Sequence, residues 1–201
     1  MKIVGITGPS GSGKSMLAGA LRARGYLTAD ADEIYHDLLA TSLPMQNELV
    51  AAFGTDILCD GQIDRRALAA KVFRTKSRKP LLRLNKITHK YVCRACIAQI
   101  RAAKEAGAKG ILLDAPLLIE ARLDRLCDLV VCVTAPTAAR IARISARDGI
   151  SKEDARARIH AQPDDLFYLK KCDYALTNDG DLAKIDEAAR EIDALLSEEH
   201  T

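Results

Sequence analysis

Eight residues near the N-terminus combine glycines, a lysine and hydroxyl groups at a spacing that has a defined chemistry. The segment 8–15 reads GPSGSGKS and fits the pattern G-x-x-x-x-G-K-[ST] in full. Glycines let such a loop curl until its amides point at an anion, and a helix beginning near Lys14 adds partial positive charge. We expect Lys14 to reach the β- and γ-phosphates of ATP and the Ser15 hydroxyl to bind Mg²⁺. The residues expected to hold the nucleotide are Gly8, Ser10, Gly11, Ser12, Gly13, Lys14 and Ser15.

This loop predicts nucleotide binding but leaves the reaction open, because ATPases, GTPases and small-molecule kinases share it. A GTPase would also carry a base-reading N-K-x-D after a strand. The segment 85–88 reads NKIT, so Thr88 stands in the place of the acid, and the segment lies in a basic, helical region. The sequence therefore favours an ATP-dependent kinase.

Carboxylates follow two of the predicted strands, at the sheet edge where α/β proteins bind ligands. Asp30 and Asp32 follow the predicted strand 26–29, and Asp114 ends the predicted strand 111–114. A kinase that acts on a hydroxyl needs a carboxylate that accepts the proton, and we expect Asp32 to be this base. The alternative role for Asp32 is an N-cap of the following helix. Asp114 is either a direct or water-mediated Mg²⁺ ligand or a structural acid.

Three arginines lie three and four residues apart in a predicted helix, so Arg140, Arg143 and Arg147 share one helical face. Arginine supplies a planar, permanently charged fork for phosphate oxygens. We expect the segment of about 137–165 to form a lid that closes on ATP, with Arg143 stabilising the transferred phosphate and Arg140 assisting. Arg147 has acidic neighbours, and ordinary surface charge explains it better.

Residues 65–104 contain thirteen basic side chains and no acidic one, so all 27 acidic residues lie outside this run. Such a distribution indicates a polyanionic ligand. The alternative is a solvated helical face. Nucleic acid is disfavoured as the ligand because only Phe73 and Tyr91 could stack on bases in this run.

The elements that must position these residues alternate along the chain. Short apolar runs predict five strands, at 2–7, 26–29, 111–114, 129–133 and 174–177. Periodic segments predict helices at 15–24, 32–40, 45–53, 137–148, from Ser151 onward and 182–196, with further helices in 65–104 that are interrupted near Pro80 and a break at 54–64. This order predicts an α/β fold with a parallel sheet flanked by helices. We expect one domain over 1–201, with a helical substrate-binding lobe inserted at about 45–107.

The bulk composition sets limits on the class of protein. With 201 residues, 48% hydrophobic and 28% charged, the chain has the composition of a globular protein. No apolar run approaches the roughly 18 residues of a membrane helix, and the N-terminus lacks signal-peptide features. We therefore expect a cytoplasmic protein. The six cysteines are irregularly spaced, and we expect the single CxxC, at Cys93 and Cys96, to consist of ordinary helix residues.

Taken together, the motifs resemble those of the dephospho-CoA kinase family, a family of P-loop kinases that completes coenzyme A biosynthesis. The resemblance runs nearly from end to end. Its pieces are the loop 8–15, the D-A-D at 30–32, LNKITH at 84–89, PLLIE at 116–120, the lid segment from Arg143 to Ser151, Gln162, and Asn178 to Gly180. Two departures from the family pattern matter most, since Lys90 replaces a usual proline and Arg140 replaces a common glutamine; Cys172 also replaces a usual alanine.

The resemblance implies a fold like that of nucleoside monophosphate kinases, with the five strands in the order 2-3-1-4-5. It implies that ATP and Mg²⁺ are used to phosphorylate the ribose 3′-hydroxyl of dephospho-CoA, with Asp32 as base and Lys14 and Arg143 as further catalytic residues. It assigns Asn178 and Gly180 to the adenine of ATP. The residues it places at the acceptor are Asp32, Lys86, His89, Pro116 and Leu117; a half-buried core histidine is the alternative for His89.

Two other functions remain open from the residues alone. One is a kinase for another nucleotide or nucleoside. The other is a nucleotide-dependent regulatory or nucleic-acid-binding protein, which would bind nucleotide tightly, turn over slowly and bind RNA in a salt-sensitive way. The oligomeric state is open, and we expect a monomer.

Overall fold

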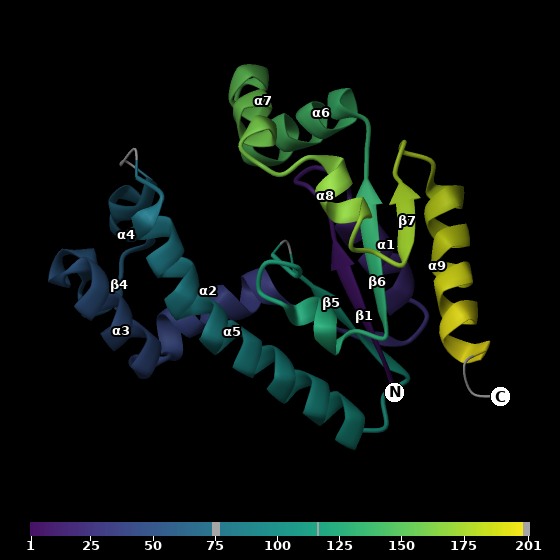
Figure 1. Cartoon of the computed structure of the whole chain (residues 1–201), viewed down its shortest axis with the longest axis horizontal. Helices are drawn as coiled ribbons and strands as arrows, with labels where there is room; N and C mark the ends of the chain where they lie inside the picture. The colour runs from purple at the N-terminus through teal and green to yellow at the C-terminus, as the bar shows by residue number, and fades with distance from the viewer. Residues whose placement is uncertain (74–76, 116, 199–201) are drawn as a thin grey trace. The chain divides into compact units, whose positions relative to one another are not determined.

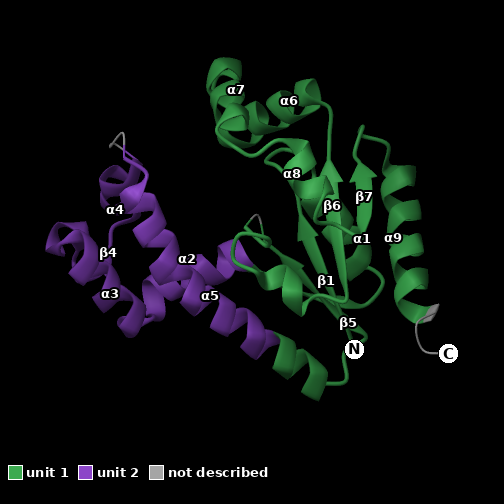
Figure 2. Ribbon diagram, viewed as in Figure 1, with its two compact units in different colours: residues 1–30, 100–201 green, residues 31–99 purple. Residues whose placement is uncertain are grey.

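The computed structural model describes residues 1–73, 77–115 and 117–198. The chain divides into two compact units, one made of residues 1–30 and 100–201 and the other of residues 31–99 (Figure 2). The second unit overlaps the predicted insertion of about 45–107, whose role in substrate binding stays a prediction. Among the described residues, no helix is long and apolar enough to cross a membrane.

The first unit is built on a five-stranded sheet in the order β2-β5-β1-β6-β7, and every neighbouring pair of strands is parallel (Figure 1). The strands are β1 (Lys2–Thr7), β2 (Tyr26–Asp30), β5 (Gly110–Asp114), β6 (Leu129–Thr134) and β7 (Tyr174–Thr177). The predicted fold class and strand order are therefore confirmed. Because parallel strands end at one edge, the segments after β1, β2, β5, β6 and β7 all begin on the same side of the sheet.

One face of this sheet is covered by α1 (Lys14–Arg22) and α9 (Leu182–Glu198). Figure 1 shows α9 running alongside β7, and α1 packs against α9. Leu17 and Leu21 of α1 and Ile192 of α9 are completely buried against the strands. Burying side chains of this size stabilises the fold by about 1.5–3 kcal/mol each. This core holds the first turn of α1 in place at the end of β1.

A short helical segment follows β6 and returns the chain to β7. It contains α6 (Thr137–Asp148), α7 (Lys152–His160) and α8 (Asp165–Leu169). The helix predicted from Ser151 onward is confirmed as α7, and the Ser151 hydroxyl caps it by accepting a hydrogen bond of 3.0 Å from the amide of Asp154. Helix α8 was not predicted from the sequence. Its signal was Asp164, whose carboxylate accepts a hydrogen bond of 2.9 Å from the amide of Phe167.

The second unit consists of helices and one small hairpin. Its elements are α2 (Ala31–Thr41), α3 (Leu43–Phe53), the 3₁₀ turn η1 (Thr55–Ile57), β3 (Leu58–Cys59), β4 (Gln62–Ile63), α4 (Arg65–Phe73) and most of α5 (Lys79–Glu105). The break in the helices that was predicted at 54–64 is confirmed, and the hairpin lies within it. Asp60 and Gly61 both have positive φ, at 51° and 78°, as a two-residue type I′ turn requires.

Pro80 lies beside the break between helices that the sequence predicted, since α4 ends at Phe73 and α5 begins at Lys79. It lies in the first turn of α5, which then runs without a break for 27 residues. A proline is tolerated there because the first amides of a helix have no intrahelical acceptor. The core of this unit is formed by Leu39, Met45, Leu49, Ile57, Leu68, Val72 and Leu84.

Candidate active site

The loop between β1 and α1 has a backbone that only glycine accommodates. Gly8, Gly11 and Gly13 have φ values of 137°, 77° and 92°. A Cβ atom on Gly8 would lie 2.2 Å from the carbonyl oxygen of Val133, and one on Gly13 would lie 2.0 Å from Nδ2 of Asn178. The curled shape expected from the motif is therefore present, and two neighbouring elements close against it.

The polar groups of this loop are suited to a bound anion. Lys14 Nζ donates to the carbonyl oxygens of Gly8 at 2.9 Å and Pro9 at 3.4 Å, which places its charge over the loop. The Ser12 hydroxyl is fully buried and has no hydrogen-bond partner among the described residues. A buried hydroxyl without a partner is costly, and a ligand oxygen would satisfy it. Ser15, the expected metal ligand, is exposed in the first turn of α1.

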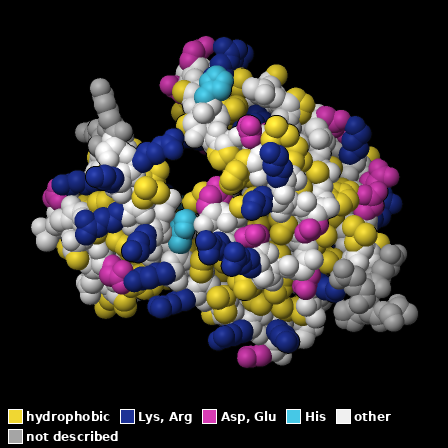
Figure 3. Space-filling view, viewed as in Figure 1, with side chains coloured by type: hydrophobic (Ala, Val, Ile, Leu, Met, Phe, Trp, Pro, Cys, Tyr) yellow, Lys and Arg dark blue, Asp and Glu magenta, His cyan; other side chains and the backbone are white. Residues whose placement is uncertain are grey.

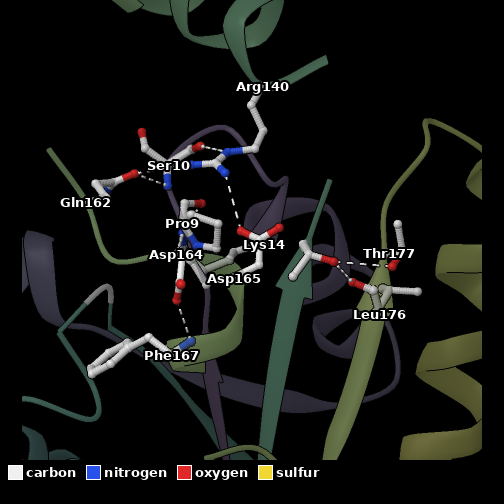
Figure 4. Close-up of polar contacts among 12 residues, drawn as sticks. Pro9, Ser10, Lys14, Arg140, Gln162, Asp164, Asp165, Phe167, Leu176 and Thr177 are labelled. Carbon is white, nitrogen blue, oxygen red and sulfur yellow. Dashed lines mark hydrogen bonds and ion pairs between the residues drawn. The ribbon is translucent and has the colours of Figure 1, made fainter. Parts of the chain in front are cut away.

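Arg140 fastens the first half of the loop to the segment after α7 (Figure 4). Only 5% of the residue is exposed, and its Nε donates to the Ser10 carbonyl at 3.0 Å. Its other nitrogens contact Asp165 Oδ1 at 3.4 Å and Gln162 Oε1 at 3.5 Å. Gln162 Oε1 also accepts a bond of 3.0 Å from the Ser10 amide. The departure from the family pattern at Arg140 therefore adds a positive charge that holds Ser10, Gln162 and Asp165 together.

Arg143 fastens the second half of the loop. Its Nη1 donates to the carbonyls of Gly11 at 3.2 Å and Ser12 at 3.1 Å, and its Nη2 donates to Oδ1 of Asn178 at 3.1 Å. Asn178 is itself buried, and its Nδ2 donates to the Ser12 carbonyl at 2.9 Å. The Gly180 amide donates to Asn178 Oδ1 at 3.0 Å. Arg143, Asn178 and Gly180 are thus brought together with the loop, and their contacts with ATP stay a prediction.

The carboxylates of β2 and β5 lie at the same sheet edge as the loop. Asp30 and Asp114 are direct register partners, and Asp114 is also paired with Ile6 of β1. The amide of Ala115 donates to the Ile6 carbonyl at 3.3 Å. Asp114 is therefore positioned at the end of the strand beside the one that leads into the loop. Its role as a metal ligand stays a prediction.

The expected base and acceptor residues are distributed over both units. Asp32 is exposed in the first turn of α2, two residues after β2 ends, and belongs to the second unit with Lys86 and His89 of α5. Leu117 is exposed in the first unit, and Pro116 lies outside the described residues. The assignment of these residues to the acceptor stays a prediction.

His89 has a buried Nε2 atom without a hydrogen-bond partner among the described residues. Burial holds the pKa of His89 below its ordinary value, because the charged imidazolium loses hydration. Its neighbour Lys90, the other departure from the family pattern, forms an ion pair of 2.5 Å with Glu48 of α3. The hydroxyl of Tyr91 donates to the same carboxylate at 2.7 Å. Lys90 therefore ties α5 to α3.

Thiol and metal-cluster chemistry have little support in the described part of the chain. Burial raises the pKa of both Cys127 and Cys132 to about 12, so neither is a thiolate at neutral pH. No group of three or more His, Cys, Asp or Glu side chains in the described residues could hold a metal. A magnesium ion would therefore depend on a few protein oxygens together with nucleotide and water, which is usual for Mg²⁺.

Asp165 is a site residue that the sequence analysis missed. It anchors Arg140 from the first turn of α8. The signal was the acidic pair 164–165 ahead of a short apolar run, which is typical of a helix N-terminus. A five-residue helix has too little periodicity to be found by that route.

Known proteins resemble this chain over almost its whole length. The family model of dephospho-CoA kinase matches residues 2–184. A dephospho-CoA kinase from Corynebacterium glutamicum is 39% identical over 196 residues, which are 96% of this chain and 97% of the relative. Among solved structures, TT1252 from Thermus thermophilus has a TM-score of 0.81 at 32% identity and covers 97% of both chains. A dephospho-CoA kinase from Campylobacter jejuni shares the fold with a TM-score of 0.70 at 24% identity, over 99% of this chain and 98% of its own.

Proposed function

The chain belongs to the dephospho-CoA kinase family, and on that premise we propose how its residues transfer the γ-phosphate of ATP to the ribose 3′-hydroxyl of dephospho-CoA. It is an ATP-dependent phosphotransferase that acts on a hydroxyl group, and its products are coenzyme A and ADP. The observation that carries the residue assignments is the curled glycine loop with Lys14 over it and a buried, unpartnered Ser12 hydroxyl inside it.

In this proposal the loop binds the phosphates of ATP. Lys14 leaves the carbonyls of Gly8 and Pro9 and pairs with the β- and γ-phosphates, which are the stronger partners because they are charged. Ser12 donates its hydroxyl proton to a phosphate oxygen. Ser15 and Asp114 would hold Mg²⁺, which neutralises charge on the phosphates when bound. Asn178 and Gly180 form the wall next to the adenine.

Arg143 has two tasks in the proposal. Its guanidinium already fixes the carbonyls of Gly11 and Ser12, so its positive charge stands directly beside the phosphate-binding loop. A fixed charge at that place stabilises the charge that spreads over the transferred phosphate, without reorganisation during the reaction. Arg140 keeps Ser10 in place and acts on ATP through the loop. The segment of about 137–165 excludes water when the nucleotide is bound.

Asp32 acts on the acceptor. Its carboxylate orients the 3′-hydroxyl and accepts the proton as the oxygen attacks the γ-phosphate in line. Lys86, His89, Pro116 and Leu117 contribute to holding the acceptor. Mg²⁺ dependence, cytoplasmic location and a monomeric state belong to the same proposal.

One assay tests the function and its alternatives. The protein is incubated with Mg-ATP and a panel of acceptors, and ADP formation is measured for dephospho-CoA, nucleosides, nucleotides and no acceptor. We expect ADP only with dephospho-CoA. Equal ADP formation with another nucleotide would favour a kinase for that nucleotide. Slow ATP hydrolysis without any acceptor would favour a nucleotide-dependent regulatory protein.

A second measurement tests the base. Asp32→Asn keeps the size of the side chain but cannot accept a proton, so turnover should fall about 10²–10⁴-fold. ATP affinity, measured by calorimetry, should stay within about twofold of the unaltered protein. Full turnover by Asp32→Asn would refute the assignment of the base.

A further inference from the structure

The exposed face of α5 carries a line of positive charge, which we call the basic stripe. Its members are spaced three, four or seven residues apart and are Lys79, Arg83, Lys86, Lys90, Arg94, Arg101 and Lys104. All seven side chains are exposed. Because an α-helix turns by about 100° per residue, they fall within a sector about 80° wide. The stripe is about 38 Å long, since the unbroken helix rises about 1.5 Å per residue.

The opposite face of α5 is buried. Leu84 and Val92 are each 9% exposed, and Cys96 is 1% exposed. Leu84 belongs to the core of the second unit. The helix is therefore held in the protein by its apolar face, and the basic stripe is left to the solvent.

Most of the charge on the stripe is not neutralised by the chain itself. The acidic residue of α5 is Glu105, at the last position of the helix. Lys90 pairs with Glu48 of α3, and within the described residues the other six members of the stripe form no ion pair. Figure 3 shows Lys and Arg side chains to be frequent on the surface of the unit that contains most of α5. This charge is therefore available to an anionic partner.

The shape of the stripe fits a linear polyanion. Neighbouring charges lie about 4.5–6 Å apart along the helix axis, with one gap of about 10.5 Å between Arg94 and Arg101. A nucleic-acid strand presents its phosphates in a line, and Lys and Arg bind them with release of counterions. A membrane surface is bound more firmly when apolar side chains lie beside the charges. Helix α5, whose 27 residues are all described, exposes Leu82 as its one large apolar side chain.

A double strand fits the stripe better than a single strand. Single strands are bound by stacking their bases on aromatic rings. Tyr91 is the aromatic residue of α5, but its ring packs against the core of the unit and its hydroxyl donates to Glu48 at 2.7 Å. A duplex keeps its bases stacked inside and offers its phosphates to the protein. The scarcity of stacking residues, which disfavours nucleic acid in the sequence, is therefore no obstacle to a duplex.

We propose that the basic stripe of α5 binds the sugar-phosphate backbone of double-stranded nucleic acid, independently of base sequence. Phosphate contacts position a protein on a duplex but carry no sequence information. At about 3.4 Å per base pair, the stripe spans about 11 base pairs. This binding is a second activity, separate from phosphoryl transfer, and does not depend on the proposed function. Lys86 is also among the residues proposed at the acceptor, so it stays unaltered in the test.

Fluorescence anisotropy with a labelled DNA duplex of about 20 base pairs, longer than the stripe, tests the proposal. The unaltered protein should bind with a Kd of about 10⁻⁴–10⁻⁶ M at physiological salt, and within twofold equally for duplexes of unrelated sequence. The triple variant Arg83→Gln/Arg94→Gln/Arg101→Gln should bind at least tenfold more weakly. The slope of log K against log salt concentration should become shallower by about 2.7, because each lost phosphate contact removes about 0.9.

A matched control removes the same amount of charge elsewhere. Arg125→Gln/Lys170→Gln/Lys171→Gln replaces three exposed positive side chains outside α5 and should keep the affinity and the salt slope of the unaltered protein. Circular dichroism would confirm that both triple variants are folded. Equal weakening in the two variants, or no saturable binding by the unaltered protein, would overturn the proposal. Tighter binding to vesicles of phosphatidylserine and phosphatidylcholine than to the duplex would overturn it in favour of a membrane surface.

Competition with dephospho-CoA separates the stripe from the proposed acceptor site. Saturating dephospho-CoA should leave the affinity for the duplex unchanged, and the KM of the stripe variant for dephospho-CoA should stay within twofold of the unaltered protein. Displacement of the duplex by dephospho-CoA would assign the stripe to the acceptor site and overturn the proposal. Failure of the protein to form ADP from dephospho-CoA would count against the proposed function alone.

Discussion

The guanidinium of Arg143 donates from Nη2 to Oδ1 of Asn178 over 3.1 Å, and this bond joins α6 to the loop after β7, 35 residues further along the chain. Both side chains also bond to the carbonyl of Ser12. The phosphate-binding loop is therefore held from outside by two elements of the C-terminal half. Its shape depends on these contacts as well as on its own glycines.

Arg143→Lys should weaken both the loop and catalysis. Lysine retains the charge but cannot bond simultaneously to Gly11, Ser12 and Asn178, and each lost bond costs about 0.5–1.5 kcal/mol. We expect a higher KM for ATP and a kcat reduced about tenfold or more, measured with saturating dephospho-CoA. Arg147→Lys, in the same helix but paired with Asp148 at the surface, is the matched control and should behave like the unaltered protein. Equal kinetics for both variants would contradict the role of Arg143.

Gly8→Ala should be far more damaging than another glycine substitution at positive φ. The new Cβ would lie 2.2 Å from the Val133 carbonyl, a backbone atom that cannot move without disturbing β6. At Gly107, with φ of 69°, a Cβ meets nothing within 4 Å, so Gly107→Ala should cost only about 1–2 kcal/mol of conformational strain. Urea unfolding and ATP titration of both variants would measure the difference. Similar stability and ATP affinity in the two would show that the loop can shift.

His89 should make the stability of the protein fall in weak acid. Burial lowers the pKa of its imidazole, so below about pH 6.5 the unfolded chain binds a proton that the folded chain resists. Its contribution to stability is present at neutral pH and is lost as the pH falls. We expect His89→Leu to lose less stability than the unaltered protein between pH 7.5 and pH 5, measured by urea unfolding. Equal losses of stability in the two proteins would show that the His89 side chain is hydrated in the folded protein.

Asp148 should contribute to stability at neutral pH and cease to do so in strong acid. The hydrogen-bonded Arg147 guanidinium, with Arg158 nearby, lowers the pKa of the carboxyl to about 2. A lowered pKa means that the stabilising effect is complete above about pH 3.8 and disappears as the pH falls toward 2. Asp148→Asn should therefore have a lower melting temperature than the unaltered protein at pH 7. The difference between the two melting temperatures should become smaller from pH 4 downward. A difference that is constant with pH would point to a packing effect of the substitution.

The sheet could be predicted well from the sequence because its strands are buried on both faces. The runs 2–7 and 174–177 match β1 and β7 residue for residue, and the other three strands differ by one residue at one end. The strand order came from the resemblance to a family, since apolar runs contain no information about their neighbours. The loop 8–15 could be recognised because its chemistry is local in sequence.

Very short elements were harder to predict, because few residues carry their sequence signal. The hairpin at 58–63 has two-residue strands, and its only clear signal was Asp60-Gly61, a dipeptide that favours a type I′ turn. Pro80 marked a break between helices that was predicted correctly, since α4 ends at Phe73 and α5 begins at Lys79. In α5 it occupies the first turn, where it is compatible with the helix.

The features of the site that could not be predicted from the sequence are contacts between residues that lie far apart along the chain. Spacing placed Arg140 and Arg143 on one helical face, but it could not show that both donate to carbonyls of the loop. The pairing of Arg140 with Asp165 arises from tertiary packing. The roles of Asp32, Lys86, His89 and Leu117 at the acceptor stay predictions, and the Asp32→Asn assay tests the first of them.

The bond from Asn178 to the Ser12 carbonyl spans 166 residues, and this has a consequence for synthesis on the ribosome. The glycine-rich loop is translated 166 residues before the side chain that braces it. A nascent chain that ends before β7 carries the whole loop motif without this brace. We therefore expect ATP to stabilise a chain that contains Asn178 better than a translation product that ends before it.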